Sequence, residues 1–392
     1  MTGTSAGPGT RKKVAVVFGT RPEAIKLAPL IHELQRDPRL EVLSVSTGQH
    51  GLMLDQVLDL FDLTPAVRLK PGESGQTLSA FSARVLAELT TTFEQNRPDL
   101  VVVQGDTSTA FIAALAAFYS ETPVVHLEAG LRSWDLGRPF PEEGNRLMIS
   151  RIAAIHLAPT AANAANLLAE GIPANSVFVT GNTVIDALHH VLKSRPPLID
   201  SGLADALTDE RPIVTVTAHR RESWGEPLRN VALAIRDLAD TANVRVIWPL
   251  HGNPAVRAVV VPVVGDHPSI SLLDPLSYSD FAQLLGRSRL VISDSGGVQE
   301  EAPALGCPVV VLRDVTERSE AVDAGAAVLV GTDRALILKH ATESLDHAGT
   351  EVVSPYGDGA ASQRCSAAIG AHLFGDEPPA AYQPRYPRMV VS

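Results

Sequence analysis

The sequence predicts an α/β protein with two doubly wound, Rossmann-like domains built on parallel sheets. Short apolar runs rich in β-branched residues recur along the 392 residues, and each is followed by a turn and a longer helix-compatible segment. Parallel strands buried on both faces have this apolar character, and the helices between them cover both faces of the sheet. The runs fall into two sets of about six, which indicates two domains.

The expected strands can be placed in chain order. In the first half they are residues 14–18, 42–45, 100–103, 124–127, 155–157 and 177–179. In the second half they are residues 213–216, 244–248, 270–273, 290–292, 309–312 and 327–330. We therefore expect an N-terminal domain over residues 1–188 with a loose start at 1–10, a hinge near residues 194–197, a C-terminal domain over 189–374, and a loose, proline-rich tail over 375–392.

The composition narrows the function classes. The net charge is −11 and no long basic run occurs, which argues against nucleic acid as a partner, because nucleic-acid binding depends on clustered Lys and Arg. No apolar stretch approaches the length of a membrane span, and the N-terminus has no apolar signal core, so no membrane contact is expected. The two cysteines, Cys307 and Cys365, indicate no disulfide scaffold, which favours a cytoplasmic location.

One segment carries the clearest sign of an anion-binding site. The apolar run at residues 290–292 ends in a turn that contains Ser295, Gly296 and Gly297, and a helix-compatible segment follows directly. A helix N-terminus presents unpaired N–H groups and the positive end of the helix dipole, so it binds anions readily. The two glycines would let a phosphate approach the backbone.

Two charged residues extend this segment. Glu301, about one turn into the helix, is placed to accept hydrogen bonds from a ribose diol, and Arg318 could supply a cation to the same anion. The alternative is an ordinary strand–turn–helix corner with solvated acidic residues, because a single short motif is weak evidence.

Further polar residues follow the carboxyl ends of other expected strands, where open parallel sheets bind their ligands. They are Arg21, Lys26, Asp106, Glu128, Glu142, Arg146, His219 and His251. Each has a structural explanation: Asp106 could cap a helix, Glu142 could lie in a solvated first turn, and His219 could be an ordinary loop histidine. Taken together, several carboxylates and a histidine at the same rim predict a cleft site.

The chain resembles the non-hydrolysing UDP-N-acetylglucosamine 2-epimerases. The matching segments occur in order between residues 14 and 374, at residues 18–23, 105–107, 126–133, 141–146, 181–186, 218–222, 294–303 and 355–359. The resemblance implies a glycosyltransferase-B-like fold with the active site in the interdomain cleft, and a homodimer. It also implies a C-terminal helix from about Gly359 that crosses back to the first domain.

The resemblance further implies reversible conversion of UDP-N-acetylglucosamine to UDP-N-acetylmannosamine. UDP would be eliminated to give a 2-acetamidoglucal and then added back. The other route to inversion at C2, oxidation by NAD, lacks its G-x-G-x-x-G fingerprint here, and the spacing typical of a zinc site is also absent from the sequence. No cofactor and no metal are therefore expected.

Roles for individual residues follow from the same resemblance. Asp106 and Glu128 are expected to move protons at C2 with help from Glu142, and His219 to donate a hydrogen bond to the leaving diphosphate. The residues expected to bind the UDP-sugar are Arg21, Lys26, Arg146, His219, Ser295, Gly296, Gly297, Glu301 and Arg318. The sequence leaves open which carboxylate serves which face of C2.

Some members of this family are regulated by a second UDP-N-acetylglucosamine beside the active site. The matching residues here are Gln49, His50, Arg220 and His251. The family pattern has arginines where this chain has Gly51 and Gly75. Because an arginine can clamp a phosphate with two hydrogen bonds, their absence predicts a weakened second site.

Three alternatives remain at this point. A hydrolysing relative would share nearly every residue but release N-acetylmannosamine and UDP. A glycosyltransferase of the same fold would need an acceptor groove, for which the sequence offers no distinguishing pattern. A non-catalytic sensor of UDP-sugars would have little need for three carboxylates and a histidine at the rim. The pathway that uses the product is also open.

Overall fold

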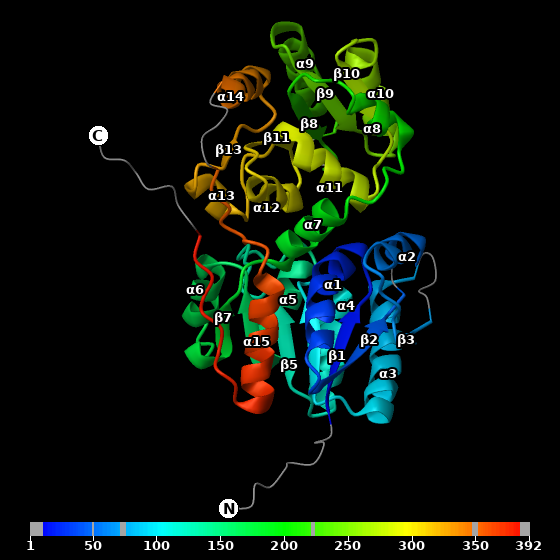
Figure 1. Cartoon of the computed structure of the whole chain (residues 1–392), viewed down its shortest axis with the longest axis vertical. Coiled ribbons are helices and arrows are strands. Elements are labelled where there is room, and N and C mark those ends of the chain that lie inside the picture. The colour runs from blue at the N-terminus through cyan, green and yellow to red at the C-terminus, as the bar shows by residue number, and fades with distance from the viewer. Residues whose placement is uncertain (1–10, 49–50, 71–75, 221–223, 347–351, 385–392) are drawn as a thin grey trace, which may run out of the picture. The chain divides into compact units, whose positions relative to one another are not determined.

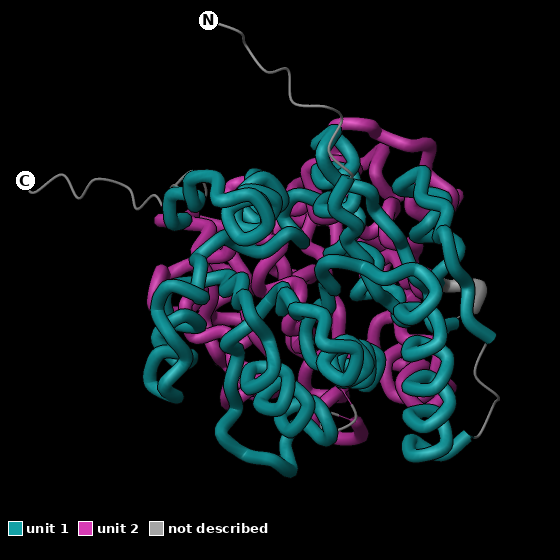
Figure 2. Tube along the Cα trace, turned by 90° about the horizontal axis from the view of Figure 1, so that it is seen from below, with its two compact units in different colours: residues 1–187, 359–382 teal, residues 188–358, 383–392 magenta. Residues whose placement is uncertain are grey.

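A computed structural model of the chain describes residues 11–48, 51–70, 76–220, 224–346 and 352–384. These residues form two compact units, which Figure 2 distinguishes by colour. Unit 1 consists of residues up to 187 together with 359–382, and unit 2 of residues 188–358 with the chain beyond 382. The division falls inside helix α7 (Thr183–Ser194), a few residues before the hinge expected at residues 194–197.

Unit 1 is built on a seven-stranded parallel sheet with the order β3-β2-β1-β4-β5-β6-β7. Its strands are β1 (Lys12–Phe18), β2 (Leu40–Ser46), β3 (Val67–Arg68), β4 (Leu100–Gln104), β5 (Val124–Leu127), β6 (Ile155–Ala158) and β7 (Val177–Val179). All six expected strands are present. The seventh, β3, has only two residues and therefore leaves no recognisable apolar run.

The helices of unit 1 connect these strands as the alternating pattern predicts (Figure 1). They are α1 (Arg21–Arg36), α2 (Gly51–Leu60), α3 (Leu78–Asn96), α4 (Ser108–Tyr119), α5 (Glu142–Ile152) and α6 (Ala161–Ala169), with a 3-10 turn at Ala174–Ser176. The sheet order changes direction between β1 and β4, so the loops after these strands lie at the switch point where such sheets bind ligands.

Unit 2 is built on a six-stranded parallel sheet with the order β10-β9-β8-β11-β12-β13. Its strands are β8 (Ile213–Thr217), β9 (Arg245–Pro249), β10 (Ile270–Leu273), β11 (Ser288–Ser293), β12 (Val309–Val311) and β13 (Ala327–Leu329). Its helices are α8 (Ser201–Ala206), α9 (Glu226–Thr241), α10 (Pro254–Val264), α11 (Tyr278–Arg287), α12 (Gly296–Ala304), α13 (Ser319–Asp323) and α14 (Arg334–Asp346). All six expected strands are present, and the switch point lies between β8 and β11.

The last helix, α15 (Ala361–Phe374), packs against α1 in unit 1 (Figure 1). Asp186 caps its first turn: the N–H groups of Ala361 and Ser362 donate to this carboxylate at 3.1 and 2.8 Å. At the other end, the guanidinium of Arg39 pairs with Asp376 at 2.7 Å. The helix is thus fixed to unit 1 at both ends.

The chain after α15 differs from the loose tail expected from residue 375. The N–H of Tyr382 donates to the carbonyl oxygen of Val179 at 2.8 Å, and Tyr382 is 6% exposed. The guanidinium carbon of Arg364 lies 5.3 Å from the centre of its ring. An aromatic side chain buried beside the edge strand β7 therefore holds this segment in place. The expected loose ends at residues 1–10 and 385–392 lie outside the described residues.

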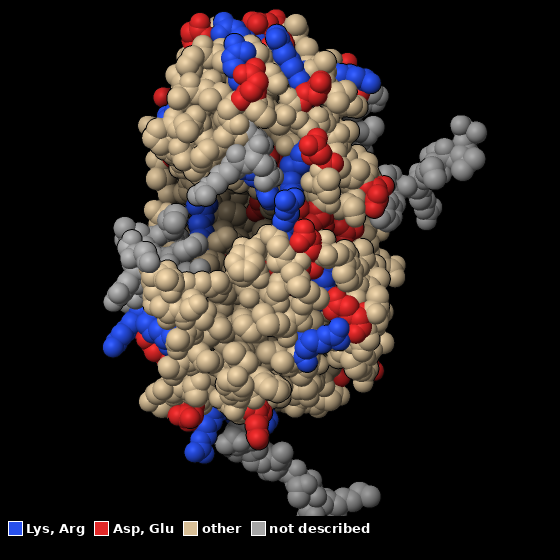
Figure 3. All heavy atoms as spheres, turned by 180° about the vertical axis from the view of Figure 1, so that it is seen from behind, with Lys and Arg blue, Asp and Glu red and all other residues tan. Residues whose placement is uncertain are grey.

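Within the described ranges, no helix combines the length and apolar character needed to cross a membrane. On the face drawn in Figure 3, Lys and Arg side chains lie beside Asp and Glu side chains.

Candidate active site

The first turn of α1 is organised by a buried carboxylate. Glu23 has no exposed surface, and its carboxylate accepts hydrogen bonds from the N–H groups of Gly19 and Thr20 at 2.9 and 2.7 Å. It also accepts one from the hydroxyl of Thr107 at 2.6 Å. Burial raises the pKa of Glu23, while these hydrogen bonds act in the opposite direction. Glu23 thereby ties the loop that leads to Arg21 to the loop after β4.

Glu128 follows β5 directly and has a left-handed backbone with φ 63°. The ammonium of Lys26 lies 2.5 and 2.7 Å from its two carboxylate oxygens. The side-chain amides of Gln104 and Asn182 also donate to it, the latter at 3.4 Å. An ionised carboxylate accepts hydrogen bonds at both oxygens, so this arrangement fits Glu128 as an oriented anion.

Asp106 follows β4, and its surroundings differ from those of Glu128. Its Oδ2 lies 2.6 Å from Nη2 of Arg146, and the aspartate side chain is 27% exposed. Burial raises the pKa of Asp106; the charge of Arg146 opposes this, and the charges of Glu128 and Glu142 add to it. The carboxylates of Asp106 and Glu128 are thus held by different partners, an arginine in one case and a lysine with two amides in the other.

The two glutamates that begin α5 have different surroundings. Glu143 is completely buried, accepts hydrogen bonds from the N–H groups of Ser133 and Trp134 at 3.0 and 3.1 Å, and lies 3.3 Å from Arg146. Oε2 of Glu142 is buried without a hydrogen-bond partner among the described residues. Glu143 therefore holds the backbone at Ser133 and Trp134, whereas one oxygen of Glu142 has no polar contact in the described part of the chain.

His126, on β5, also contributes to this edge of the sheet. It is fully buried, and its Nε2 lies 2.7 Å from the carbonyl oxygen of Gly105. Burial lowers the pKa of His126 to about 3, so the ring is neutral at physiological pH and donates this hydrogen bond through Nε2. Gly105 has a φ of 67° and immediately precedes Asp106, so His126 helps to position that aspartate.

In unit 2, the turn after β11 forms the predicted helix start. Ser295 is the N-cap of α12, and its side chain makes no capping hydrogen bond. A Cβ atom on Gly296 would lie only 2.9 Å from Cζ of Arg318, so the guanidinium packs directly over this glycine. Arg318 is held there by Glu300 at 2.8 Å and by Glu317 at 2.6 Å. The guanidinium, paired with these two glutamates, therefore lies beside the start of α12, where the helix dipole has its positive end.

His219 lies at the end of the neighbouring strand β8 and contacts a carboxylate that has no predicted role. Its Nδ1 is 3.1 Å from Oδ1 of Asp294, which is 1% exposed. The ring of His219 stacks near that of His251, with the ring centres 6.5 Å apart and an interplanar angle of 16°. The side chain of Arg220 donates from Nε to the carbonyl oxygen of Asp294 at 3.1 Å.

The expected site residues therefore lie in the loops that follow parallel strands or in the first two turns of the helices after these loops. In unit 1 they are Arg21, Lys26, Asp106, Glu128, Glu142 and Arg146; in unit 2 they are His219, Arg220, His251, Ser295, Gly296, Gly297, Glu301 and Arg318. Gln49 and His50 lie outside the described residues. In the described part of the chain, no group of three or more His, Cys, Asp or Glu side chains could hold a metal ion.

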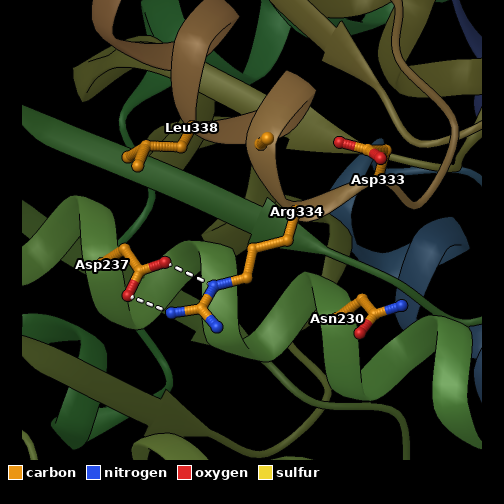
Figure 4. A pocket seen from close by; sticks show the side chains of 6 residues that line it. Asn230, Asp237, Asp333, Arg334 and Leu338 are labelled. Atoms are coloured by element: carbon orange, nitrogen blue, oxygen red, sulfur yellow. Dashed lines mark hydrogen bonds and ion pairs between the residues drawn. The ribbon is translucent and has the colours of Figure 1, made fainter.

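A pocket in unit 2 lies apart from these strand ends, between α9 and α14 (Figure 4). Arg334 spans it and pairs with both carboxylate oxygens of Asp237 at 2.6 and 2.7 Å. The remaining lining residues are Asn230, Asp333, Ala335 and Leu338. Since this arginine is already paired, the pocket offers no free charge to an anion.

Two parallel α/β units, one with oriented carboxylates and one with a glycine-rich helix start beside a guanidinium, fit a nucleotide-sugar enzyme of the glycosyltransferase-B-like class. The family model described as UDP-N-acetylglucosamine 2-epimerase matches residues 32–370. The chain therefore belongs to the UDP-N-acetylglucosamine 2-epimerase family, as its sequence motifs predict.

Individual relatives agree with this assignment. The chain is 42% identical over 376 residues to UDP-N-acetylglucosamine 2-epimerase of Escherichia coli K12, a match that covers 91% of this chain and 98% of the relative. It is 45% identical over 361 residues to the Bacillus subtilis 168 protein of the same name, covering 90% and 93%. The crystal structure of UDP-GlcNAc 2-epimerase from Neisseria meningitidis bound to UDP-GlcNAc has a TM-score of 0.82 and 42% identity, with coverage of 93% and 100%.

Proposed function

We propose that this protein interconverts UDP-N-acetylglucosamine and UDP-N-acetylmannosamine without net hydrolysis. The observation that carries the proposal is the pair Asp106 and Glu128. These carboxylates follow the neighbouring strands β4 and β5 at the same end of the sheet, and different partners hold them. An epimerase that removes a proton from one face and returns one to the other needs two such groups. The names of the relatives support the same substrate.

The first step would break the bond between C1 and the diphosphate oxygen. The electron pair of this bond leaves with UDP, a carboxylate takes the proton from C2, and the C2–H electron pair forms the C1–C2 double bond of a 2-acetamidoglucal. The second step reverses these changes on the opposite face of C2. UDP acts as leaving group and then as nucleophile, so atoms and charge balance over the cycle.

Unit 2 would stabilise the charge on the departing UDP. The N–H groups in the first turn of α12 and the guanidinium of Arg318 suit a diphosphate, and Glu301 suits the hydroxyls of the ribose. His219 would donate a further hydrogen bond to the diphosphate. Arg21, at the first position of α1 in unit 1, would add another cation.

Unit 1 would supply the groups that act on C2. Asp106 and Glu128 would exchange the protons, with Glu142 assisting through the oxygen that has no hydrogen-bond partner among the described residues. Lys26 and Arg146 would bind the sugar while holding these carboxylates, because each already contacts one of them. All of these unit 1 side chains are buried or half-buried, so water screens their charges only in part.

Turnover in deuterium oxide tests the reaction directly. Purified protein is incubated with UDP-N-acetylglucosamine, and the nucleotide sugars are resolved and examined by NMR and mass spectrometry. The expected result is UDP-N-acetylmannosamine with deuterium at C2 and nowhere else. Free N-acetylmannosamine as the main product would establish the hydrolysing alternative, turnover that needs an acceptor would establish the glycosyltransferase, and binding without turnover would establish the sensor.

We also propose a cytoplasmic homodimer. Helix α4 carries no charged residue, yet Phe118 is 53% and Tyr119 is 64% exposed, which favours contact with a second copy. The free cysteines Cys307 and Cys365 are consistent with a reducing compartment. Light scattering after gel filtration, and cell fractionation, test the two parts; a monomer at micromolar concentration would overturn the first.

A further inference from the structure

Asp106 lies between two residues whose positions are fixed by buried side chains. The carbonyl oxygen of Gly105, before it, accepts the Nε2–H of His126 at 2.7 Å. The hydroxyl of Thr107, after it, donates to the carboxylate of Glu23 at 2.6 Å. His126 and Glu23 have no exposed surface. The backbone on either side of Asp106 is therefore anchored, to β5 on one side and to α1 on the other.

Asn145, in the first turn of α5, holds the backbone of Asp106 itself. Its side-chain Nδ2 lies 2.9 Å from the carbonyl oxygen of Asp106. A carbonyl oxygen can only accept a hydrogen bond, so the amide atom that faces it must be the NH2 donor. Asn145 is 5% exposed, so water has little access to this contact. The main chain of Asp106 is thus fixed by a neutral side chain from a separate helix.

The same face of α5 also contacts the carboxylate of Asp106. Residues three and four positions apart share a helix face, so Asn145 and Arg146 both lie on the side of α5 that carries Glu142. Nη2 of Arg146 lies 2.6 Å from Oδ2 of Asp106, while Asn145 holds the carbonyl oxygen. Two successive residues of one helix therefore hold the aspartate in two ways, one by charge and one by a neutral hydrogen bond.

These two contacts respond differently to a proton. A carboxyl group that gives and takes a proton is charged in one state and neutral in the other, so the attraction between Arg146 and Asp106 weakens when the aspartate is protonated. A hydrogen bond to a backbone carbonyl does not depend on that charge. The pKa of His126 is about 3, so its ring is neutral throughout the pH range of a turnover assay. The carbonyl contacts of Asn145 and His126 therefore persist in both protonation states of Asp106.

We propose that Asn145 is a positioning residue that fixes the carbonyl oxygen of Asp106 and thereby keeps its carboxylate in place whether or not it carries a proton. This inference rests on the proposed function, in which Asp106 exchanges a proton with C2 of the sugar. A group that transfers a proton must lie within hydrogen-bond reach of it, and a displacement of about 1 Å can lower a rate about a hundredfold. His126 supports the same arrangement one residue earlier in the loop.

Asn145→Ala tests the proposal by a split between kcat and KM. The substitution removes the hydrogen bond to the carbonyl oxygen of Asp106 and no contact proposed for the substrate. We expect kcat to fall about tenfold or more, with the KM for UDP-N-acetylglucosamine and the affinity for UDP changed by less than about twofold. Wild-type kcat would overturn the proposal. A rise in KM as large as the fall in kcat would also overturn it, because Asn145 would then act on substrate binding.

Asn145→Leu separates the hydrogen bond from packing. Leucine is similar in size to asparagine but has no N–H donor, so kcat should stay as low as in Asn145→Ala. Recovery of the wild-type kcat in Asn145→Leu would assign the residue to packing and refute the proposal.

Asn96→Ala provides a matched control in the same unit. The side-chain amide of Asn96, at the end of α3, donates to the carbonyl oxygen of Thr92 at 2.9 Å, so its loss removes a contact of the same kind and length. This variant should keep the wild-type kcat. An equal loss of kcat in Asn96→Ala and Asn145→Ala would attribute the effect to general destabilisation and contradict the proposal.

The pH profile separates the role of Asn145 from that of Arg146. The groups that act electrostatically on the carboxylate of Asp106 are Arg146, Glu128, Lys26 and Glu142. Asn145 is neutral and contacts the carbonyl oxygen instead, so the acid limb of kcat in Asn145→Ala should keep its wild-type midpoint while the whole profile is lowered. A midpoint that moves to higher pH would show that Asn145 controls the proton affinity of the carboxylate, which the proposal excludes.

Hydrogen exchange tests the positioning without turnover. The N–H of Gly105 donates to the carbonyl oxygen of Leu127 at 2.9 Å. Loosening of the loop in Asn145→Ala should accelerate exchange of this N–H about tenfold or more, whereas Asn96→Ala should leave it unchanged. Wild-type exchange at Gly105 in both Asn145→Ala and Asn145→Leu would overturn the proposal. Because this readout needs no reaction, accelerated exchange in a protein without epimerase activity would contradict only the proposed function.

Discussion

Nη2 of Arg146 lies 2.6 Å from Oδ2 of Asp106, and the same guanidinium lies 3.3 Å from Oε2 of the buried Glu143. Arg146 therefore joins the first turn of α5 to the loop after β4. The arginine side chain is only 6% exposed, so its charge acts on Asp106 with little screening by water. This contact links the protonation of the aspartate to the placement of α5.

Arg146→Met should change how activity depends on pH. Removing the guanidinium leaves burial and the neighbouring glutamates opposed mainly by the charge of Lys26, so the pKa of Asp106 should rise further above its usual value. Where ionised Asp106 is required, the acid limb of kcat should move to higher pH and activity at neutral pH should fall about tenfold or more. Arg151→Met, on the same helix but with a 57% exposed side chain, should leave the profile unchanged. An unmoved acid limb in Arg146→Met would show that Arg146 does not control the protonation of Asp106.

The three carboxylates can be tested by isosteric substitution. Asp106→Asn, Glu128→Gln and Glu142→Gln should each lower turnover by about a hundredfold or more, the usual scale of general acid–base catalysis. Calorimetry should show a much smaller change in UDP affinity, because the groups proposed for the diphosphate lie mainly in unit 2. Glu94→Gln, an exposed position on α3, is the control. Full activity in any of the three variants would remove that residue from the mechanism.

The sequence predicts nearly all of the sheet architecture, because buried parallel strands leave apolar runs that can be recognised without neighbours. All twelve expected strands occur, whereas β3, with two residues, leaves no such run. The packing of Tyr382 beside Val179 could not be predicted either, because no apolar run marks this proline-rich segment. The packing depends on one side chain and one backbone hydrogen bond.

For the site, the sequence predicts which residues gather at the strand ends but not which of them contact one another. Asp294 belongs to a recognised motif, but its partner His219 lies 75 positions earlier in the chain. Likewise, Arg146 contacts Asp106, although either residue alone has a simpler explanation as a surface cation or a helix cap. Pairing across strands depends on the order of the sheet, which no local pattern contains.

Protonation of His126 should contribute to acid unfolding. Its pKa is about 3 in the folded protein and near 6.5 when unfolded, so the unfolded state binds more protons between these values and stability falls as the pH is lowered. Between pH 6 and pH 4.5 this histidine should remove about 2 kcal/mol from the free energy of unfolding. Urea titrations should show a shallower pH dependence for His126→Gln. The exposed His189→Gln should retain the wild-type slope, and an unchanged slope in His126→Gln would contradict the assignment.

Asp186 should anchor the C-terminal helix. Asp186→Ala leaves the N–H groups of Ala361 and Ser362 without their carboxylate acceptor, which should cost about 1–3 kcal/mol in the free energy of unfolding. Amide exchange over residues 361–374 should accelerate. Asp200→Ala, which removes the cap of α8 in unit 2, should destabilise the protein without affecting that exchange. Unchanged protection of α15 in Asp186→Ala would show that its other contacts suffice.

The absence of arginine at Gly51 and Gly75 leads to a prediction about regulation. In a regulated homologue, the second nucleotide sugar is needed for the reverse reaction, which stalls when only UDP-N-acetylmannosamine is supplied. Each missing charge-assisted contact to a pyrophosphate should weaken that second site by roughly 1.5–3 kcal/mol, about tenfold or more. The reverse reaction should therefore begin at once, with no lag and a hyperbolic dependence on substrate.

Restoring the cations provides the decisive comparison. Gly51→Arg combined with Gly75→Arg should introduce a lag that a trace of UDP-N-acetylglucosamine abolishes, because two guanidinium groups again favour the doubly occupied state. Single substitutions should give a shorter lag, and Gly51→Gln, which adds bulk without charge, should give none. Progress curves started with pure UDP-N-acetylmannosamine measure all of these. A long lag in the wild-type enzyme would show that Arg220, His251 or another side chain already supplies the regulatory contact, and that the two glycines do not weaken the site.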